Sequence, residues 1–164
     1  MFKTGDTVIH PAWVVCKIKD VQNSLSDDKN DSVYILKPYK MKDVGDFKIL
    51  VTMKQIKQSG IRRPVKEKNI PEIFDVLEEK PNDLSTNRDD IYSLMKEKLS
   101  RGDLCNCAEV LRDMKQHNNL QGSYMHRELL ESARKILVEE IAYVKGESRT
   151  QINRLIDNAL SKKY

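Results

Sequence analysis

The residues that could bind a metal are few and scattered. The chain has three cysteines and three histidines, with Cys105 and Cys107 in a C-x-C pair and Cys16 far from both. A structural zinc site needs about four ligands at closer spacing. An odd number of cysteines also argues against a disulfide framework. The sequence therefore predicts no metal and no cofactor, with Cys16 and Cys107 as small buried residues and Cys105 half exposed.

Residues for catalysis are no better placed. Adjacent carboxylates occur at 78–79, 89–90 and 139–140, but neighbours on a helix point in different directions and are poor acid–base partners. The six glycines stand far apart, which argues against a phosphate-binding glycine-rich loop. His117 and His126 could meet across a turn, but no nucleophile accompanies them. We expect no catalytic residues and a binding protein rather than an enzyme; an unrecognised enzymatic site is the alternative.

Charge is distributed unevenly along the chain. The 164 residues are 39% hydrophobic and 33% charged, with a net charge of +4. Residues 1–68 carry 14 basic and 8 acidic side chains, whereas residues 69–164 carry 15 and 17. A basic front half suits nucleic acid, an acidic protein partner, or solubility alone. No apolar run is long enough for a signal peptide or a membrane span, so we expect a cytoplasmic protein without a membrane partner.

Short β-branched runs fill the first 65 residues. Strands are expected at 7–9, 14–21, 33–36 and 47–51, with a polar hairpin loop at 24–32. Several short strands in so short a stretch predict a small, strongly bent antiparallel sheet or barrel. The lysines around this sheet either serve a partner that adds to an edge strand or only prevent self-association. They are Lys37, Lys40, Lys42 and Lys48.

Beyond residue 65 the hydrophobic period changes from 2 to 3.6. The basic stretch 57–68, which contains Gly60 and Pro64, is the expected domain junction. Short connections predict an antiparallel bundle. The expected fold class is thus α+β, with a β domain at 1–65 and a bundle of about five helices at 66–164. The expected helix starts are Asn69, one of 85–87, Asp103, Ser123 and Ser148, and the expected ends include Gly102 and Gly146.

Three segments occur in the order seen in a known family. The chain opens with MFKTGDTVIHP at 1–11 and has RGD at 101–103 followed by AEVLRDM at 108–114. Ser123 then precedes ARKILVEEI at 133–141. Together these segments resemble the CarD/CdnL family of bacterial RNA polymerase-binding transcription regulators, and the resemblance spans the whole chain.

The resemblance implies a function for each half. Residues 1–65 would form a Tudor-like module, shared with transcription-repair coupling factor, that binds the polymerase β subunit. Residues 66–164 would reach promoter DNA at the upstream edge of the melted bubble, weakly and without sequence specificity. The implied activity is modulation of promoter open-complex stability. The alternative is an adaptor that binds polymerase but has lost its action on promoter DNA. We expect a monomer or a domain-swapped dimer.

The resemblance also assigns a polymerase-binding site. Two polymerase-contacting arginines of the family fall on Ser24 and Leu50 of this sequence. The expected polymerase-binding residues are Ser24, Ser26, Lys48 and Leu50. In the same module Trp13 stands where the family has a histidine, and Val14 replaces a nearby glycine.

The DNA-contacting positions depart further from the family pattern. In the family a tryptophan wedges into the minor groove and slows bubble collapse, and this position falls on Arg88. The basic residues that follow it fall on Asp90 and Ile91. A basic position in the fourth helix is kept as Arg127. The expected DNA-binding residues are Arg88, Tyr92, Lys96 and Arg127.

Overall fold

A computed structural model describes residues 2–12, 14–23, 32–40, 45, 47–117 and 123–162. Trp13, Lys42, residues 24–31 of the expected hairpin loop and residues 118–122 lie outside the described residues. The chain divides into two compact units, Met1–Pro64 (unit 1) and Val65–Tyr164 (unit 2).

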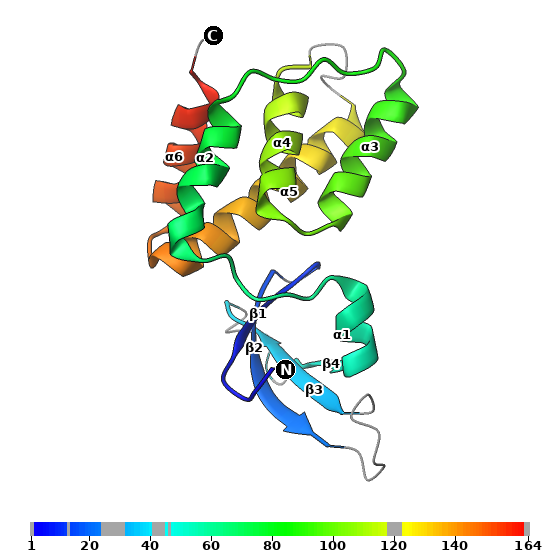
Figure 1. Cartoon of the computed structure of the whole chain (residues 1–164), viewed down its shortest axis with the longest axis vertical. Helices are drawn as coiled ribbons and strands as arrows, with labels where there is room; N and C mark the ends of the chain where they lie inside the picture. Colours follow the sequence, from blue (N-terminus) through cyan, green and yellow to red (C-terminus); the bar gives the residue numbers. More distant parts are fainter. Residues whose placement is uncertain are drawn as a thin grey trace. The chain divides into compact units, whose positions relative to one another are not determined.

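Unit 1 is built on a four-stranded antiparallel sheet. Its strands are β1 Thr7–His10, β2 Val14–Gln22, β3 Val33–Pro38 and β4 Ile49–Thr52. They lie in the order β1-β2-β3-β4, so each strand pairs with its neighbour in sequence (Figure 1). The register shifts between Ile18 and Asp20, and a bulge of this kind increases the local twist. The expected small, bent antiparallel sheet is confirmed.

One face of the sheet carries the core of unit 1. Alternate residues of the strands point to this face, as the two-residue period of a strand requires. The cluster contains Val8, Cys16, Ile18, Tyr34, Leu36, Val51, Ile56 and Ile61. Ile56 belongs to a helix, so this helix covers the inner face of the sheet.

That helix, α1 Met53–Ser59, was not expected from the sequence, which predicted only a strand and a junction there. Its start is a capping box: Thr52 Oγ1 accepts from the Gln55 amide at 3.2 Å, and Gln55 Oε1 accepts from the Thr52 amide at 2.9 Å. Gly60, with φ of +75°, ends the helix in the left-handed region. The Thr-x-x-Gln pattern of the capping box was present in the sequence, but a helix of seven residues is too short to show a helical period.

The segment after α1 closes one edge of the sheet. The Ile9 amide donates to the Arg62 carbonyl at 2.7 Å, and the Arg62 amide donates back to Ile9 at 3.2 Å. Arg63 lies 3.6 Å from an Asp6 carboxylate oxygen and stacks over the Phe2 ring at 4.9 Å. These contacts cover the outer edge of β1 at Ile9. Among the described residues, no strand pairs with the outer edge of β4.

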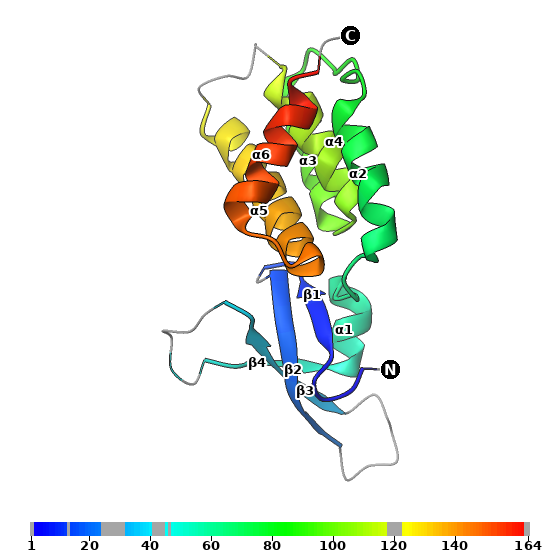
Figure 2. The same ribbon diagram turned by 90° about the vertical axis from the view of Figure 1, so that its left-hand side faces the viewer.

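Unit 2 is a helical bundle. A short 3-10 turn, Glu67–Asn69, leads into helices that run in alternating directions along the chain (Figures 1 and 2). The expected caps Asn87, Asp103, Ser123 and Ser148 all accept backbone hydrogen bonds at helix starts, and Gly146 ends its helix with φ of +66°. The helices are α2 Ile70–Glu78, α3 Arg88–Ser100, α4 Leu104–Lys115, α5 Tyr124–Lys145 and α6 Arg149–Leu160. The expected bundle of about five helices is confirmed.

Two expected helix boundaries differ in detail. Asn69 occupies the cap position of α2, but its side chain makes no capping hydrogen bond. The residue at the C-cap of α3 is Arg101, and Gly102 follows it with φ of +69°. Gly102 therefore supplies the left-handed turn one residue later than expected.

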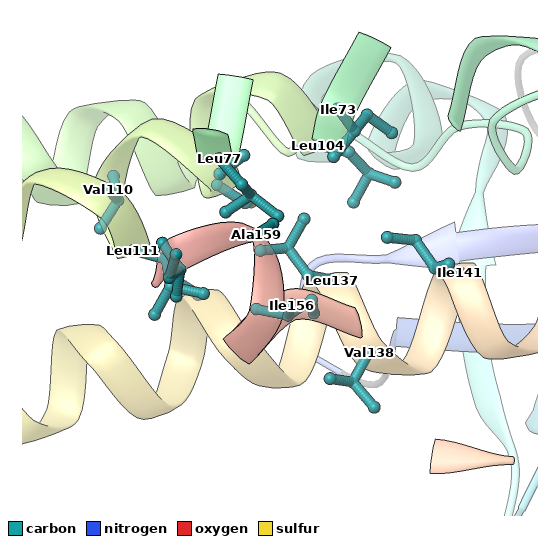
Figure 3. Packing of buried hydrophobic residues seen from close by; sticks show 14 of the residues in the cluster. Ile73, Leu77, Leu104, Val110, Leu111, Leu137, Val138, Ile141, Ile156 and Ala159 are labelled. Carbon is teal, nitrogen blue, oxygen red and sulfur yellow. The ribbon is translucent and has the colours of Figure 1, made fainter. Parts of the chain in front are cut away.

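The core of unit 2 lies around α4, which packs against α2, α3 and α5. Leu104 and Leu111 of α4 point into the same core as Leu77 of α2 and Leu137 of α5 (Figure 3). Cys107 is buried and Cys105 is partly exposed, as the sequence predicted. The apolar stripes of the helices are therefore core.

A buried ion pair attaches the α2–α3 connection to α4. Arg112 Nε donates to Asp113 Oδ1 at 2.8 Å, and both side chains are buried. The Asn82 amide donates to Asp113 Oδ1 at 3.0 Å, and Asn82 Nδ2 donates to Oδ2 at 3.2 Å. Arg112 Nη1 donates to the Val76 carbonyl at 3.1 Å and to Glu79 at 3.2 Å. The connection that leads to the start of α3 is thus held at Glu79 and Asn82.

None of the helices in the described part of the chain combines the length and the apolar character needed to cross a membrane.

Candidate functional site

The face of the unit 1 sheet opposite its core holds the described part of the expected polymerase site. Leu50 of β4 is 63% exposed, and Lys48 precedes the strand and is exposed. Because Tyr34, Leu36 and Val51 point to the core, their neighbours in the strands point outward. Leu50 therefore lies outward, directly opposite Ile35 in the register.

The same face carries two lysines at close range. Lys17 of β2 and Lys37 of β3 are directly opposite each other in the register. Like charges placed opposite each other destabilise a sheet. We call the set Lys17, Ile35, Lys37, Lys48 and Leu50 the outer face.

The sequence predicted part of the outer face. Ser24 and Ser26, the other two expected polymerase-binding residues, lie outside the described residues. Lys17 and Ile35 were not among the expected site residues. The alternation in VYILKP could have shown that Ile35 and Lys37 share a face. The pairing of Lys17 with Lys37 depends on the strand register, which the sequence alone does not specify.

The four expected DNA-binding residues lie on two helices of unit 2. Arg88 is the first residue of α3 and is exposed. Tyr92 and Lys96 follow at intervals of four residues, which places all three on one side of the helix. Arg127 is exposed in the second turn of α5. We call this set of four the α3–α5 face.

A side-chain hydrogen bond joins α3 to the start of α5. Tyr92 Oη and Ser123 Oγ lie 2.8 Å apart. Ser123 also caps α5, because its Oγ accepts from the His126 amide at 3.1 Å. The bond therefore holds the middle of α3 at the end of α5 that carries Arg127.

Acidic groups accompany the cations of α3. Asp89 and Asp90 are exposed in its first turn, where their amides donate to Asn87 Oδ1 at 2.9 and 3.2 Å. Farther along α3, Lys98 pairs with Glu109 at 2.7 Å. The exposed carboxylates beside Arg88 oppose the approach of phosphates to the start of α3.

The thiols are poorly suited to nucleophilic chemistry. Burial raises the pKa of the Cys16 thiol to about 12. Burial also raises the pKa of Cys105, with smaller contributions from nearby carboxylates, Asp103 first. The reactive form of cysteine is the thiolate, which both shifts disfavour. Within the described residues, no group of three or more His, Cys, Asp and Glu side chains is placed to hold a metal ion.

Comparison with known proteins agrees with this architecture. The family described as CarD, C-terminal domain matches residues 72–157, which is more than half of the chain and covers α3 to α5 in full. The chain belongs to the CarD family, which confirms the resemblance seen in the sequence. The protein of Bacillus subtilis (strain 168) named putative transcription factor YdeB is 21% identical over 155 residues. That match covers 93% of this chain and 97% of the relative.

Proposed function

We propose that this protein is a transcription regulator that binds the β subunit of bacterial RNA polymerase and modulates the stability of the promoter open complex. Membership of the CarD family and the name of the B. subtilis relative support a regulator of transcription rather than an enzyme. The observation that carries the polymerase-binding part is the outer face of unit 1, where Leu50 of the edge strand β4 is largely exposed.

The chemistry of the outer face fits a protein strand. The exposed edge of β4 offers main-chain donors and acceptors to which an extended segment can pair. Leu50 and Ile35 provide an apolar contact beside that edge, and apolar contacts near the centre of an interface supply much of its binding energy. Lys17 and Lys37 lie on one side of this apolar pair, and the exposed Asp20 lies opposite Ile35 on β2. The partner segment would therefore be apolar at its centre and acidic on the side that faces the lysines.

Unit 2 would act on promoter DNA through the α3–α5 face. An arginine can enter a narrowed minor groove as a cation, which gives Arg88 a role that does not require base unstacking. Tyr92, Lys96 and Arg127 would contact the sugar–phosphate backbone. Such contacts carry little sequence information, so the promoter would be selected by polymerase rather than by this protein.

A second candidate function is an adaptor that docks on polymerase without stabilising the melted promoter. The exposed carboxylates of Asp89 and Asp90 beside Arg88 favour it, because they oppose phosphate binding at the start of α3. Both candidates share the polymerase contact and differ only in the action of unit 2.

Two measurements on the full chain test the proposal. Immobilised protein should retain purified bacterial RNA polymerase, and a crosslink to the β subunit should identify the contact. The lifetime of a promoter open complex after challenge with a DNA competitor should then change when the protein is added. Retention without any change in lifetime supports the adaptor. If polymerase is not retained even at low salt, the proposal is wrong.

A further inference from the structure

A second positively charged surface lies elsewhere in unit 1. Residues 53–64, from the first residue of α1 to the end of the unit, contain four basic side chains and no acidic one. The charge of these twelve residues is +4, which equals the net charge of the whole chain. We call 53–64 the basic segment. Its cations are Lys54, Lys57, Arg62 and Arg63.

The fold exposes three of these cations, and Arg62 is partly exposed, with Nη1 donating to the Arg63 carbonyl at 3.1 Å. Ile56 anchors α1 in the core of unit 1, and Lys54 and Lys57 are exposed on the same helix. They stand three residues apart, so they are neighbours on the helix surface. Arg62 is held by its backbone against β1, and Arg63 is 60% exposed although it pairs with Asp6. The basic segment is therefore a positioned surface within unit 1.

The composition of the exposed surface distinguishes between partners. The large hydrophobic side chains that are exposed in the described part of unit 1 are Tyr39, Phe47 and Leu50, and none of them lies in the basic segment. Protein–protein interfaces are enriched in aromatic residues and depleted in lysine. Protein–DNA interfaces are more polar and much more positively charged. The basic segment has the second character. The outer face differs from it because an apolar side chain, Leu50, is 63% exposed there beside the lysines.

We propose that the basic segment binds the phosphate backbone of duplex DNA. Lysine and arginine side chains that neutralise phosphates release condensed counterions, and this gives binding that is independent of sequence and strongly dependent on salt. The contact goes beyond the proposed function, which gives unit 1 only a polymerase surface, and it can exist whether or not polymerase binds the outer face.

Binding of the full chain to a short DNA duplex of arbitrary sequence, followed by fluorescence anisotropy over a salt series, tests this proposal. The test variant is Lys54→Gln with Lys57→Gln. The matched control is Lys19→Gln with Lys135→Gln, which removes the same charge from two exposed positions outside the basic segment. Two lost phosphate contacts should reduce the slope of log affinity against log salt by about 2 and weaken binding at low salt about tenfold or more. The control variant should change neither the salt slope nor the low-salt affinity by a comparable amount.

Three results would overturn the proposal. The first is wild-type protein that fails to bind the duplex at low salt. The second is an equal loss of affinity in both variants, which would mean that only net charge matters. The third is a test variant that keeps its DNA affinity but loses retention of polymerase, which would identify the basic segment as a contact for an acidic protein surface. Thermal unfolding curves of both variants should match wild type, because only exposed side chains change.

Discussion

Arg88 stands at the position where the resemblance to the CarD/CdnL family places a wedge tryptophan. An arginine cannot unstack a base step by bulk, whereas a tryptophan can. We expect Arg88→Trp to lengthen the open-complex lifetime in a competitor-challenge assay with polymerase. A gain of about 1 kcal/mol in the stability of the melted state corresponds to a lifetime about fivefold longer. Arg88→Ala is the matched control and should shorten the lifetime slightly. If wild type already stabilises the complex strongly and Arg88→Ala changes nothing, position 88 has no role.

Val14 is a buried β-branched residue with φ of +54°, in the region that favours glycine. The left-handed conformation costs a residue with a Cβ about 1–2 kcal/mol, which glycine does not pay. Elsewhere in a strand glycine is less stable than alanine. We therefore expect Val14→Gly to be at least as stable as Val14→Ala in urea unfolding, although both lose apolar burial. A Val14→Ala protein that is more stable than Val14→Gly by about 1 kcal/mol would contradict this.

Cys16 gives a prediction about pH. Burial penalises the charged thiolate and raises its pKa from 9.0 to about 12. The folded state therefore holds this proton at pH values where the unfolded state has released it, so the free energy of unfolding should fall as pH rises from 9 toward 12. At pH 8 the thiol should react with a chromogenic disulfide reagent only as fast as the protein opens. Cys16→Ala should remove this part of the alkaline destabilisation; an identical pH profile for the variant would contradict the account.

The α2–α3 connection depends on the buried Asp113. Removing its carboxylate leaves Arg112 buried without that partner and frees the Asn82 amide. Breaking a buried pair in this way costs about 3–5 kcal/mol, so Asp113→Ala should greatly lower the midpoint of urea unfolding. Asp103→Ala removes only a helix cap and should cost about 1 kcal/mol. Similar losses in the two variants would mean that the buried network contributes little beyond local capping.

Most elements were predictable because their signals are local. Asn87, Asp103, Ser123 and Ser148 cap helices where the sequence placed them, since a short polar side chain before an apolar periodic segment satisfies free amides. The sequence analysis did not predict α1, because seven residues hold too few turns to establish a helical period. The capping box was the one local signal for this helix.

The candidate site was less predictable, because its contacts join residues far apart in sequence. The pairing of Lys17 with Lys37 depends on strand register, and the Tyr92–Ser123 bond joins two helices. The polar character of Tyr92 and Ser123 was visible in the sequence, but their proximity follows only from how α3 packs on α5.

At the scale of the whole molecule, the two units carry different surfaces. Unit 1 combines a basic and apolar outer face with the separate basic segment. Unit 2 sets exposed carboxylates beside the first cation of its α3–α5 face. This difference leads to the central claim that recruitment to polymerase depends on unit 1, whereas unit 2 adjusts what happens at the promoter.

The affinity of the full chain for purified RNA polymerase tests that claim most directly. Leu50→Asp places a charge in the middle of the outer face, while Leu155→Asp makes the same change at an exposed leucine of α6. The few residues that cost more than about 1 kcal/mol when truncated cluster near the centre of an interface, and a buried unpaired charge costs more. We predict that Leu50→Asp weakens binding about tenfold or more and that Leu155→Asp binds like wild type. Equal affinity of Leu50→Asp and wild type would contradict the account.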